Sequence, residues 1–436
     1  MNVVKVGLLG LGTVGGGTVN VLERNGREIS RRSGCQLLVT KACARDIKLE
    51  RICNTQGIQL STNPYDIIND PDIQIVLEVM GGEEPAKSLI LAALAQGKHV
   101  ITANKALIAL HGNELFAAAA KHNVILAYEA AIAGGIPIVK AIREGLSGNK
   151  IEWLAGIING TGNFILSEMR DKGSAFEDVL QQAQELGYAE ADPTFDVEGI
   201  DAAHKLCILA SLAFGTPLNF AGVYTEGISK VTPLDLTYAE ELGYRIKHLG
   251  IARKTEQGVE MRVHPTLIPA KRLIANVNGV MNAVLVKGNA VGATMYYGPG
   301  AGADATASAV VADMVDICRQ LDVSADHQVP SLGFLNDQLE ELPLLSIEQV
   351  KTAFYLRLSV ADKSGVMAAI TTILADNGIS IEAVLQKVAE QHSANTLVIL
   401  LTNSVVEKSL MTALEEIESL DTTVGPAVRI RVESLQ

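Results

Sequence analysis

The sequence predicts an α/β protein with three domains: an N-terminal doubly wound parallel sheet, a mixed α+β domain and a C-terminal ferredoxin-like domain. Three observations lead there. Short apolar runs alternate with helical stretches near the N-terminus, this pattern changes after residue 134, and the last part follows a β-α-β-β-α-β order. A chain of 436 residues with 48% hydrophobic and 19% charged residues is long and apolar enough for several packed cores.

The first domain, placed at residues 1–133, alternates strands with helices. A helix is predicted from the glycine-rich turn after the first strand to about Arg24. The other helices are predicted at 85–96 and 106–122, and the strands at 3–9, 36–44, 73–80, 99–102 and 124–128. Such alternation predicts parallel strands joined by crossover helices.

The second domain, placed at 134–338, mixes both kinds of element. Helices are predicted at 162–172, 174–186 and 199–214, and strands at 148–158, 260–266, 283–287 and 290–296. A glycine-rich turn at 298–302 then leads into an alanine- and valine-rich helix, placed at 303–321 in the domain plan.

A linker is predicted at 339–351 and a third domain at 352–436. Phe354, Leu356, Leu358 and Val360 alternate with polar residues, which indicates a strand. A helical stripe that Asn377-Gly378 closes follows, and strands near 379–388, 394–402 and 426–433 with a helix at 405–419 complete the ferredoxin-like order.

The bulk composition excludes several function classes. A formal net charge of −13 argues against nucleic acid or an anionic membrane as the main partner. The five cysteines are odd in number and none forms a CxxC pair, so a reducing compartment is expected instead of a disulfide framework or a zinc site. Because no signal peptide and no apolar run long enough to span a membrane is present, a cytoplasmic location is expected.

The motif Gly10-x-Gly12-x-x-Gly15 follows a predicted strand and opens a predicted helix. In this context the first glycine allows the tight turn, the second admits a pyrophosphate close to the backbone, and the third permits close helix packing. The N–H groups at the helix start, including those of Thr13 and Val14, would face the anion. The pattern predicts a Rossmann-type dinucleotide site; the alternative is a tight turn without a ligand.

Cofactor choice depends on the end of the second strand. An acid there favours the ribose hydroxyl of NAD, and an arginine favours the 2′-phosphate of NADP. Both Arg45 and Asp46 are present, and we favour NADP because Arg45 lies nearer the strand end and Lys41 adds positive charge. Use of NAD stays open.

Lys105 follows a predicted strand at the carboxyl edge of the sheet, where ligands bind in open α/β sheets. It is therefore a candidate for contact with the nicotinamide or the substrate. The alternative is a helix residue that points to solvent.

The stretch EADPTFDVEGIDAAHK, residues 190–205, gathers five carboxylates ahead of one lysine. Asp201 and Lys205 are spaced i,i+4 and share a helix face, and the residues that follow are almost all apolar. Because a helix that is apolar all round is buried, both charges are expected to point into protein or a cleft. The alternative is a structural ion pair, with Asp196 or Glu198 capping the helix.

Beside a nicotinamide cofactor, this stretch suggests hydride transfer to and from a carbonyl carbon. Lys205 would stabilise the reacting oxygen and donate its proton, and Asp201 would hold the ammonium group. The other carboxylates would bind a cationic group of a small substrate, such as an α-amino group.

The chain resembles the homoserine dehydrogenases that carry a C-terminal ACT domain. The matching segments are GLLGLGTVGGG, VITANKALIA, YEAAIAGGIPIVKAI, INGTGNFIL, GYAEADPTFDVEGIDAAHKL and YYGPGAGADATASAVVADM. The resemblance implies reversible oxidation of L-homoserine to L-aspartate 4-semialdehyde with NAD(P), in threonine, methionine and isoleucine biosynthesis.

The same resemblance implies roles for individual residues. Lys205 is the proton donor with Asp201 beside it, Glu190 binds the substrate amino group, and Asp196 is a further substrate residue. Lys105 lies beside cofactor and substrate. Gly187 and Gly302 border the cofactor, and Glu129, Ile132, Gly134 and Ile136 give mainly main-chain oxygens to a sodium ion. The helix after Gly302 would return to the nucleotide domain, and the middle domain would build the interface of a homodimer or homotetramer.

The C-terminal segments AFYLRLSVADKSGVMAAI and DNGISIEAV resemble an ACT domain. The resemblance implies feedback inhibition by L-threonine. The regulatory candidates lie in the loop before the first helix and at that helix's end, and they are Asp362, Gly365, Val366, Asn377 and Ile379. The alternative is a purely structural oligomerisation module.

Two other functions are alternatives. An ACT-bearing dehydrogenase of 2-hydroxy acids would need cations for a carboxylate and a His–acid pair, whereas residues 187–205 offer carboxylates and a lysine. A non-catalytic, NAD(P)-dependent amino-acid sensor would keep the glycines and the ACT domain but has no need of Lys205.

Overall fold

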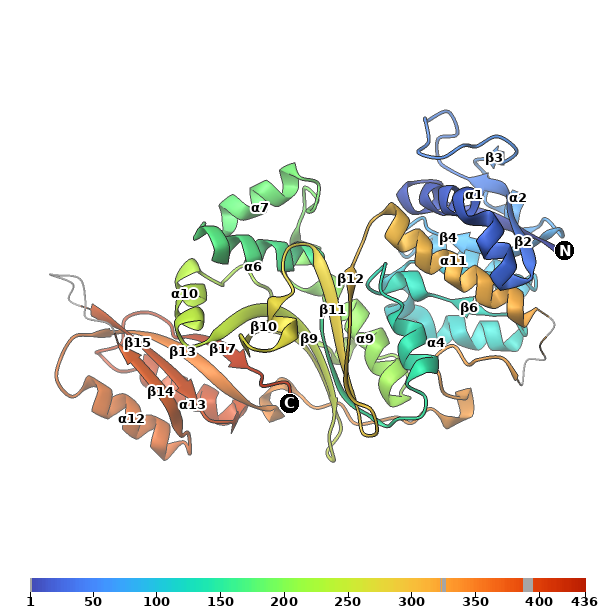
Figure 1. Ribbon diagram of the computed structural model, residues 1–436. Coiled ribbons are helices and arrows are strands. Elements are labelled where there is room, and N and C mark those ends of the chain that lie inside the picture. Colours follow the sequence, from blue (N-terminus) through green and yellow to red (C-terminus); the bar gives the residue numbers. More distant parts are fainter. Residues whose placement is uncertain (1, 322, 324–326, 387–394) are drawn as a thin grey trace. The chain divides into compact units, whose positions relative to one another are not determined.

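The computed structural model describes residues 2–321, 323, 327–386 and 395–436 (Figure 1). The chain divides into two compact units, each built from three segments. The first unit comprises Met1–Gly160, Asp201–Val223 and Val280–Leu342, and the second comprises Thr161–Ile200, Tyr224–Gly279 and Pro343–Gln436.

The first unit contains a six-stranded parallel sheet in the order β3-β2-β1-β4-β5-β6. Its strands are β1 (Asn2–Leu9), β2 (Cys35–Cys43), β3 (Gln59–Ser61), β4 (Ile73–Glu78), β5 (His99–Thr102) and β6 (Leu126–Ala127). Its helices are α1 (Thr13–Ser33), α2 (Tyr65–Ile68), α3 (Ala86–Ala95) and α4 (Lys105–Lys121). The order turns back on either side of β1, so β1 and β4 mark the switch point where such sheets bind ligands.

Helix α11 (Ala303–Gln320) packs against both this sheet and α1, although it lies far along the chain (Figure 1). Val310 and Met314 enter the same core as Val6 and Leu8 of β1. A Cβ built on Gly17 would lie 2.8 Å from the carbonyl oxygen of Ala303, so α1 and α11 meet closely near their N-termini.

The first unit also holds three antiparallel strands and the apolar helix. Strand β11 (Met281–Gly288) pairs with β12 (Gly292–Pro299) and with β7 (Ile151–Ile157). Helix α9 (Ile200–Phe214) is buried along almost its whole length. The short turns between β6 and β7 are η1 (Glu129–Ala131), α5 (Ile138–Lys140) and the π-helical η2 (Ala141–Gly145).

In the second unit one sheet joins the middle and C-terminal segments, in the order β9-β10-β17-β13-β15-β14. Its strands are β9 (Tyr244–Lys254), β10 (Val259–Pro269), β13 (Lys351–Ala361), β14 (Ile381–Gln386), β15 (Asn395–Thr402) and β17 (Val428–Val432), with β8 (Tyr224–Thr225) beside β10 and β16 (Val405–Val406) beside β13. The helices are α6 (Gly160–Lys172), α7 (Phe176–Glu185), α8 (Thr194–Val197), α10 (Pro233–Glu241), α12 (Val366–Asp376) and α13 (Glu407–Glu418), with the 3₁₀ turns η4 (Leu273–Asn276) and η7 (Ile347–Gln349). Strands β13, β14, β15 and β17 with α12 and α13 form the C-terminal ferredoxin-like domain, whose core gathers residues of β13, α12, β15 and α13.

The fold class agrees with the sequence expectation, but the limits of α1 differ, and several elements were not expected, among them β3, α2, β9 and α10. Helix α1 runs to Ser33 and not to Arg24, because Ile29 packs against α11 and offsets the low helix propensity of Gly26. Strand β9 was not expected at all. Its buried Lys247 and His248 break the apolar pattern that marks a buried strand.

Candidate active site

The glycine-rich loop joins β1 to α1 at the carboxyl edge of the parallel sheet. Gly10 has φ +107°, and a Cβ there would lie 2.7 Å from the carbonyl oxygen of Val79. A Cβ on Gly15 would lie 2.3 Å from the carbonyl oxygen of Gly10, so neither position admits a side chain. A Cβ on Gly12 would meet nothing within 4 Å, which leaves space beside the backbone. This cradle fits the pyrophosphate of a dinucleotide.

Helix α1 begins at Thr13, directly after this loop, and no side chain caps its N-terminus. The first N–H groups of the helix, which include those of Thr13 and Val14, can therefore serve an anion. Gly302, with φ +120°, is the N-terminal cap residue of α11, and a Cβ there would meet nothing within 4 Å. The close approach of Gly17 to Ala303 brings this second helix start near the first.

Arg45 and Asp46 are both exposed just after β2. The carboxylate of Asp46 accepts a hydrogen bond from the main-chain N–H of Lys48 at 2.8 Å, so it also stabilises its own loop. Arg51 was not among the expected residues. Its guanidinium donates to the main-chain carbonyl of Leu11 at 2.8 Å, and to that of Asp46, which brings a further cation to the glycine-rich loop.

Side chains at the ends of β4 and β5 stabilise the loop that follows β4, at residues 79–82. The buried carboxylate of Glu78 accepts hydrogen bonds from Thr102 at 2.6 Å and from the main chain of Met80 at 2.7 Å. Burial raises the pKa of Glu78 in spite of these bonds. Asn104 caps α4 through a hydrogen bond from the main chain of Leu107, and it donates to the carbonyl of Gly82 at 2.6 Å. This cap makes Lys105 the first residue of α4.

Lys105, Asp201 and Lys205 lie together at this edge of the first unit. The Nζ atom of Lys205 is 2.6 Å from Oδ2 of Asp201, and it donates to the carbonyl oxygen of Ile158 at 2.7 Å. The Nζ atom of Lys105 is 3.2 Å from Oδ1 of Asp201. Asn159 donates to Oδ2 of the same carboxylate at 2.9 Å. One carboxylate thus binds two ammonium groups. Of the two residues that follow β7, Asn159 donates to this carboxylate and Ile158 accepts from Lys205.

Asp201 is 4% exposed, so its charge needs these partners. Burial alone would raise the pKa of Asp201, but the charges of Lys205 and Lys105 outweigh burial and lower it to about 2. The carboxylate is therefore ionised at neutral pH. His204 points elsewhere, as expected for a packed core histidine: it is buried and its ring stacks on Phe220 with centroids 4.3 Å apart.

The loop from Glu129 to Ile136 follows β6 and is strained at Ala133, a non-glycine residue with φ +50°; Gly134 follows with φ +22°. The carboxylate of Glu129 accepts from the main-chain N–H groups of Val139 and Lys140 at 2.8 and 2.9 Å. In the described part of the chain, no group donates a hydrogen bond to the carbonyl of Ile132 or Gly134. Free carbonyl oxygens on a strained loop fit a hard cation such as sodium.

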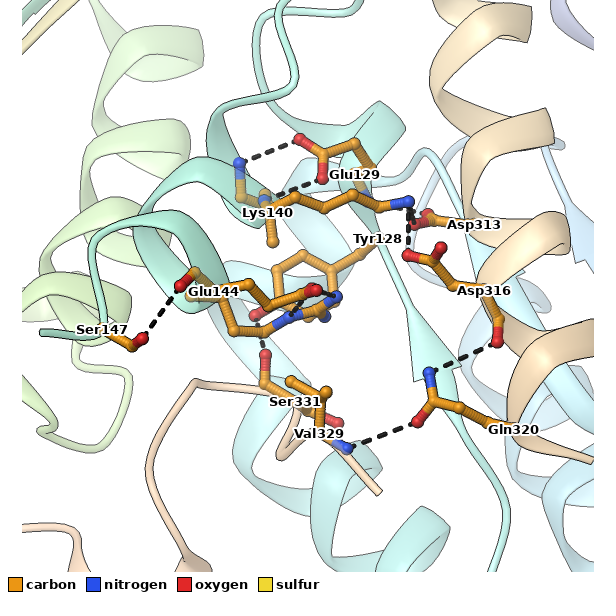
Figure 2. A network of polar contacts seen from close by, with 12 residues as sticks. Tyr128, Glu129, Lys140, Glu144, Ser147, Asp313, Asp316, Gln320, Val329 and Ser331 are labelled. Carbon is orange, nitrogen blue, oxygen red and sulfur yellow. Dashed lines mark hydrogen bonds and ion pairs between the residues drawn. The ribbon is translucent and has the colours of Figure 1, made fainter. Parts of the chain in front are cut away.

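Beneath this loop lies a network of polar contacts (Figure 2). Asp313 of α11 accepts from the main-chain N–H of Glu129 at 2.9 Å. Lys140 reaches Oδ2 of Asp316 at 2.5 Å and lies 3.9 Å from Oδ1 of Asp313. Tyr128 donates to the carbonyl of Ser331 at 2.6 Å. Within the described ranges no group of three or more His, Cys, Asp or Glu side chains is arranged to hold a metal ion.

Gly187, Glu190 and Asp196 belong to the second unit, and their roles at cofactor and substrate stay predictions. Gly187, with φ +74°, follows α7, and Glu190 is exposed with its main-chain carbonyl accepting from Gln184 at 3.0 Å. Two other acids of this stretch have local partners. Asp192 accepts from the main chain of Thr194 at 3.1 Å, and Glu198 accepts from Ser229 at 2.8 Å.

The five regulatory candidates surround α12. Asp362 is exposed, and Gly365, with φ +91°, is the cap residue before the helix. Asn377 donates to the carbonyl of Ile373 at 3.0 Å. The side chains of Val366 and Ile379 are buried in the core of the domain, so only their main chains are available to a ligand.

Three family models match the chain. They are described as homoserine dehydrogenase, NAD binding domain (residues 10–129), homoserine dehydrogenase (137–315) and ACT domain (354–421). A homoserine dehydrogenase of Pseudomonas aeruginosa is 58% identical over 435 residues, which cover 100% of both chains. Among the described residues, no helix has the length and apolar character needed to cross a membrane.

Solved structures agree with these matches. A homoserine dehydrogenase from Thiobacillus denitrificans is 58% identical, with a TM-score of 0.95 over 100% of this chain and 99% of that one. A hyperthermophilic archaeal homoserine dehydrogenase in complex with NADPH is 25% identical, with a TM-score of 0.60 over 72% of this chain and 97% of that one. The chain belongs to the homoserine dehydrogenase family of oxidoreductases, with a nicotinamide-cofactor-binding domain and a C-terminal ACT domain.

Proposed function

We propose that the chain interconverts L-homoserine and L-aspartate 4-semialdehyde with NAD(P), and that Lys205 transfers the proton. The observation that carries this proposal is the Lys205 ammonium, held 2.6 Å from the buried carboxylate of Asp201 and 2.7 Å from the carbonyl of Ile158. This reaction serves the biosynthesis of threonine, methionine and isoleucine.

A bound nicotinamide supplies or accepts the hydride at the substrate carbon. In the reducing direction, Lys205 stabilises the negative charge that develops on the aldehyde oxygen and gives it a proton. Asp201 fixes the direction of that ammonium group and balances the charge of Lys105. In the oxidising direction the proton of the hydroxyl group returns to Lys205. In this proposal Glu190 binds the ammonium group of the substrate, which keeps its hydroxyl carbon in register, and Asp196 is a further substrate residue.

We propose NADP as the preferred cofactor, with NAD as an alternative. The support is the exposed Arg45 just after β2, Arg51 bonded to Leu11 of the glycine-rich loop, and the NADPH complex of the archaeal relative. Gly10, Gly12, Thr13, Val14, Gly15, Gly187 and Gly302 form the remaining cofactor contacts in this proposal. Arg45→Ala should raise the KM for NADP much more than the KM for NAD, and equal changes would contradict the preference.

The catalytic proposal is tested by homoserine-dependent reduction of NADP and of NAD. Lys205→Ala should lower kcat about 10²- to 10⁴-fold, as expected for loss of a proton-transfer group, while NADPH binding measured by fluorescence persists. Lys172→Ala is the matched control, because Lys172 forms an i,i+4 pair with Glu168 on the surface. Full turnover by Lys205→Ala would refute the proton-donor role, and cofactor binding by the unaltered chain without turnover would favour an amino-acid sensor.

We infer that L-threonine inhibits the enzyme through the ACT domain, at Asp362, Gly365, Val366, Asn377 and Ile379. Deleting the domain is a poor test because Glu433 is the partner of the buried Arg262, at 2.6 Å, and deletion would strand that charge. Asp362→Ala should raise the threonine concentration for half-inhibition at least about tenfold, the scale of one charge-assisted contact. Asp421→Ala, another exposed acid of the same domain, should not. Equal inhibition of both variants would contradict this site.

We also propose that a sodium ion binds oxygens, mainly of the main chain, of Glu129, Ile132, Gly134 and Ile136. Support comes from the strained loop and from its carbonyls at Ile132 and Gly134. Isothermal titration with NaCl against choline chloride would test it, and equal heats would refute it. We further propose four parts of the chain, at residues 1–133, 134–338, 339–351 and 352–436. We also propose that the protein is a homodimer or homotetramer, and light scattering would give the mass of the oligomer.

A further inference from the structure

The segment Tyr224–Asp235 links β8 to α10 within the second unit, and we call it the bridging segment. Side chains from the ACT domain bind it at both ends, and its middle binds Val197 and Glu198 of the acid-rich stretch, residues 190–205. No catalytic or regulatory residue discussed above lies in this segment.

Arg431 of β17 binds the first end. Its guanidinium lies 2.9 Å from the carboxylate of Glu226 and its carbon is 5.0 Å from the centroid of the Tyr224 ring. Glu407 binds the same guanidinium from the ACT side, with Nε to Oε2 at 2.8 Å. Burial opposes the charge of Glu226, but Arg431 outweighs burial and lowers the pKa of Glu226. Arg431 is buried, whereas the Glu226 side chain is 31% exposed, so loss of Glu226 would free the bridging segment from Arg431 while Glu407 still neutralises the buried guanidinium.

Arg357 and Tyr355 of β13 bind the other end. Asp235, whose side chain is fully buried, accepts from Nε of Arg357 at 2.7 Å and from its second nitrogen at 3.1 Å. Tyr355 donates to the same carboxylate at 3.1 Å. Asp235 also forms the capping box of α10 with Thr232, so this contact fixes the start of that helix.

The middle of the segment holds the acid-rich stretch. The main-chain N–H of Ile228 donates to the carbonyl of Val197 at 2.9 Å, and Ser229 donates to Glu198 at 2.8 Å. Contact is close, because a Cβ on Gly227 would lie 2.4 Å from the carboxylate of Glu198. A shift of the bridging segment must therefore carry Val197 and Glu198 with it.

We propose that Glu226 and Ser229 are positioning residues for the substrate-binding acids Glu190 and Asp196, and that the ACT domain sets this position through Arg431 and Arg357. The inference rests on the proposed substrate role of those two acids. It gives Glu198 a task that the reaction itself does not. It also connects an effector bound to the ACT domain with substrate affinity through hydrogen bonds and ion pairs. Such a connection is allosteric only if it carries a coupling free energy between the two sites, and adjacency alone is not sufficient.

The test compares Glu226→Gln, Ser229→Ala and the double variant in the full-length enzyme. Glu240→Gln is the matched control, because Glu240 pairs with Arg245 at 2.6 Å in an exposed part of the same unit. We expect the KM for L-homoserine to rise about tenfold in Glu226→Gln and about threefold in Ser229→Ala, the scale of one lost hydrogen bond. The KM for NADP should change less than about twofold, and the double variant should be no worse than Glu226→Gln, because the two residues act as a unit.

A second readout needs no activity. Amide hydrogen exchange of residues 190–199 should be faster in Glu226→Gln and Ser229→Ala than in Glu240→Gln. Unchanged exchange, or a lower melting temperature with an unchanged KM for homoserine, would overturn the positioning role. If the unaltered enzyme does not oxidise homoserine, the proposed reaction fails, and the exchange measurement still decides whether these residues position the stretch.

Discussion

The substitution Asp201→Asn tests the charge arrangement of the candidate active site most directly. It keeps the size of the side chain and its contact with Asn159, but it leaves the ammonium groups of Lys105 and Lys205 without their shared counterion. Asp201 is 4% exposed and Lys205 has an 11% exposed side chain, so water does not readily replace the lost charge.

The magnitude follows from the pKa. Its fall from 3.8 to about 2 in the folded protein corresponds to about 2.5 kcal/mol in favour of the charged carboxylate, at 1.36 kcal/mol per pH unit. Removing one member of a buried pair costs more than that, about 3–5 kcal/mol, because a charge is left buried and unpaired. We therefore expect Asp201→Asn to unfold at clearly lower urea concentration and to lower kcat about 10²-fold or more.

A double-mutant cycle with Lys205→Met measures the coupling. The double variant removes both charges of the Asp201–Lys205 pair, so neither is left buried without the other. If the pair is coupled, the double variant should therefore lose less unfolding free energy than the sum of the two single variants. Its kcat should be no lower than that of Lys205→Met, because the residues act as a unit. Additive losses of unfolding free energy, within about 0.5 kcal/mol, would refute the reasoning.

Three further outcomes are expected. Gly12→Ala should raise the KM for NADP at least about tenfold without loss of stability, since its Cβ meets only the space assigned to the pyrophosphate, while Gly26→Ala in α1 should leave that KM unchanged. Glu190→Gln should raise the KM for L-homoserine, whereas Asp192→Asn should not, because Asp192 bonds only locally to Thr194; the reverse result would contradict the assignment. Burial lowers the pKa of His99 from 6.5 to about 4, so the unfolded state binds more protons between these values. Stability should therefore fall by at most about 3 kcal/mol as pH drops through that window, and His99→Gln should flatten the fall in urea titrations.

What the sequence could predict depends on how local the signal is. The strand, glycine-rich turn and helix at the N-terminus are contiguous, so their order and the start of the helix followed from spacing, although the end of the helix did not. Asp201 and Lys205 are one helical turn apart, and the apolar run after them indicated burial correctly. Asn159 had a weaker signal, because it directly follows a predicted strand.

Contacts between distant segments left no local signal. Glu129 and Asp313 are 184 residues apart, and no pattern in either segment indicates that they meet. Arg431 and Glu226 are 205 residues apart. Arg431 lies near the end of the short strand β17, and Glu226 directly follows the short strand β8. Such pairs are set by the packing of whole elements, as in strand β9, where Lys247 is buried because Asn163, Val277 and Asn278 surround its ammonium group.

The acid-rich stretch shows how the structure divides a cluster that the sequence presents as one. Asp201 holds two lysines, Asp192 bonds to the main chain of Thr194, and Glu198 bonds to Ser229 of the bridging segment. Each of these three carboxylates already has a partner within the protein, and a substrate ammonium group would have to compete with that partner. Glu190 is different: it is exposed, and only its main-chain oxygen has a contact among those given above, with Gln184. If the stretch binds the substrate as proposed, its ammonium group meets less competition at Glu190 than at these three acids, so Glu190→Gln should weaken homoserine binding more than a loss of acidity elsewhere in the stretch.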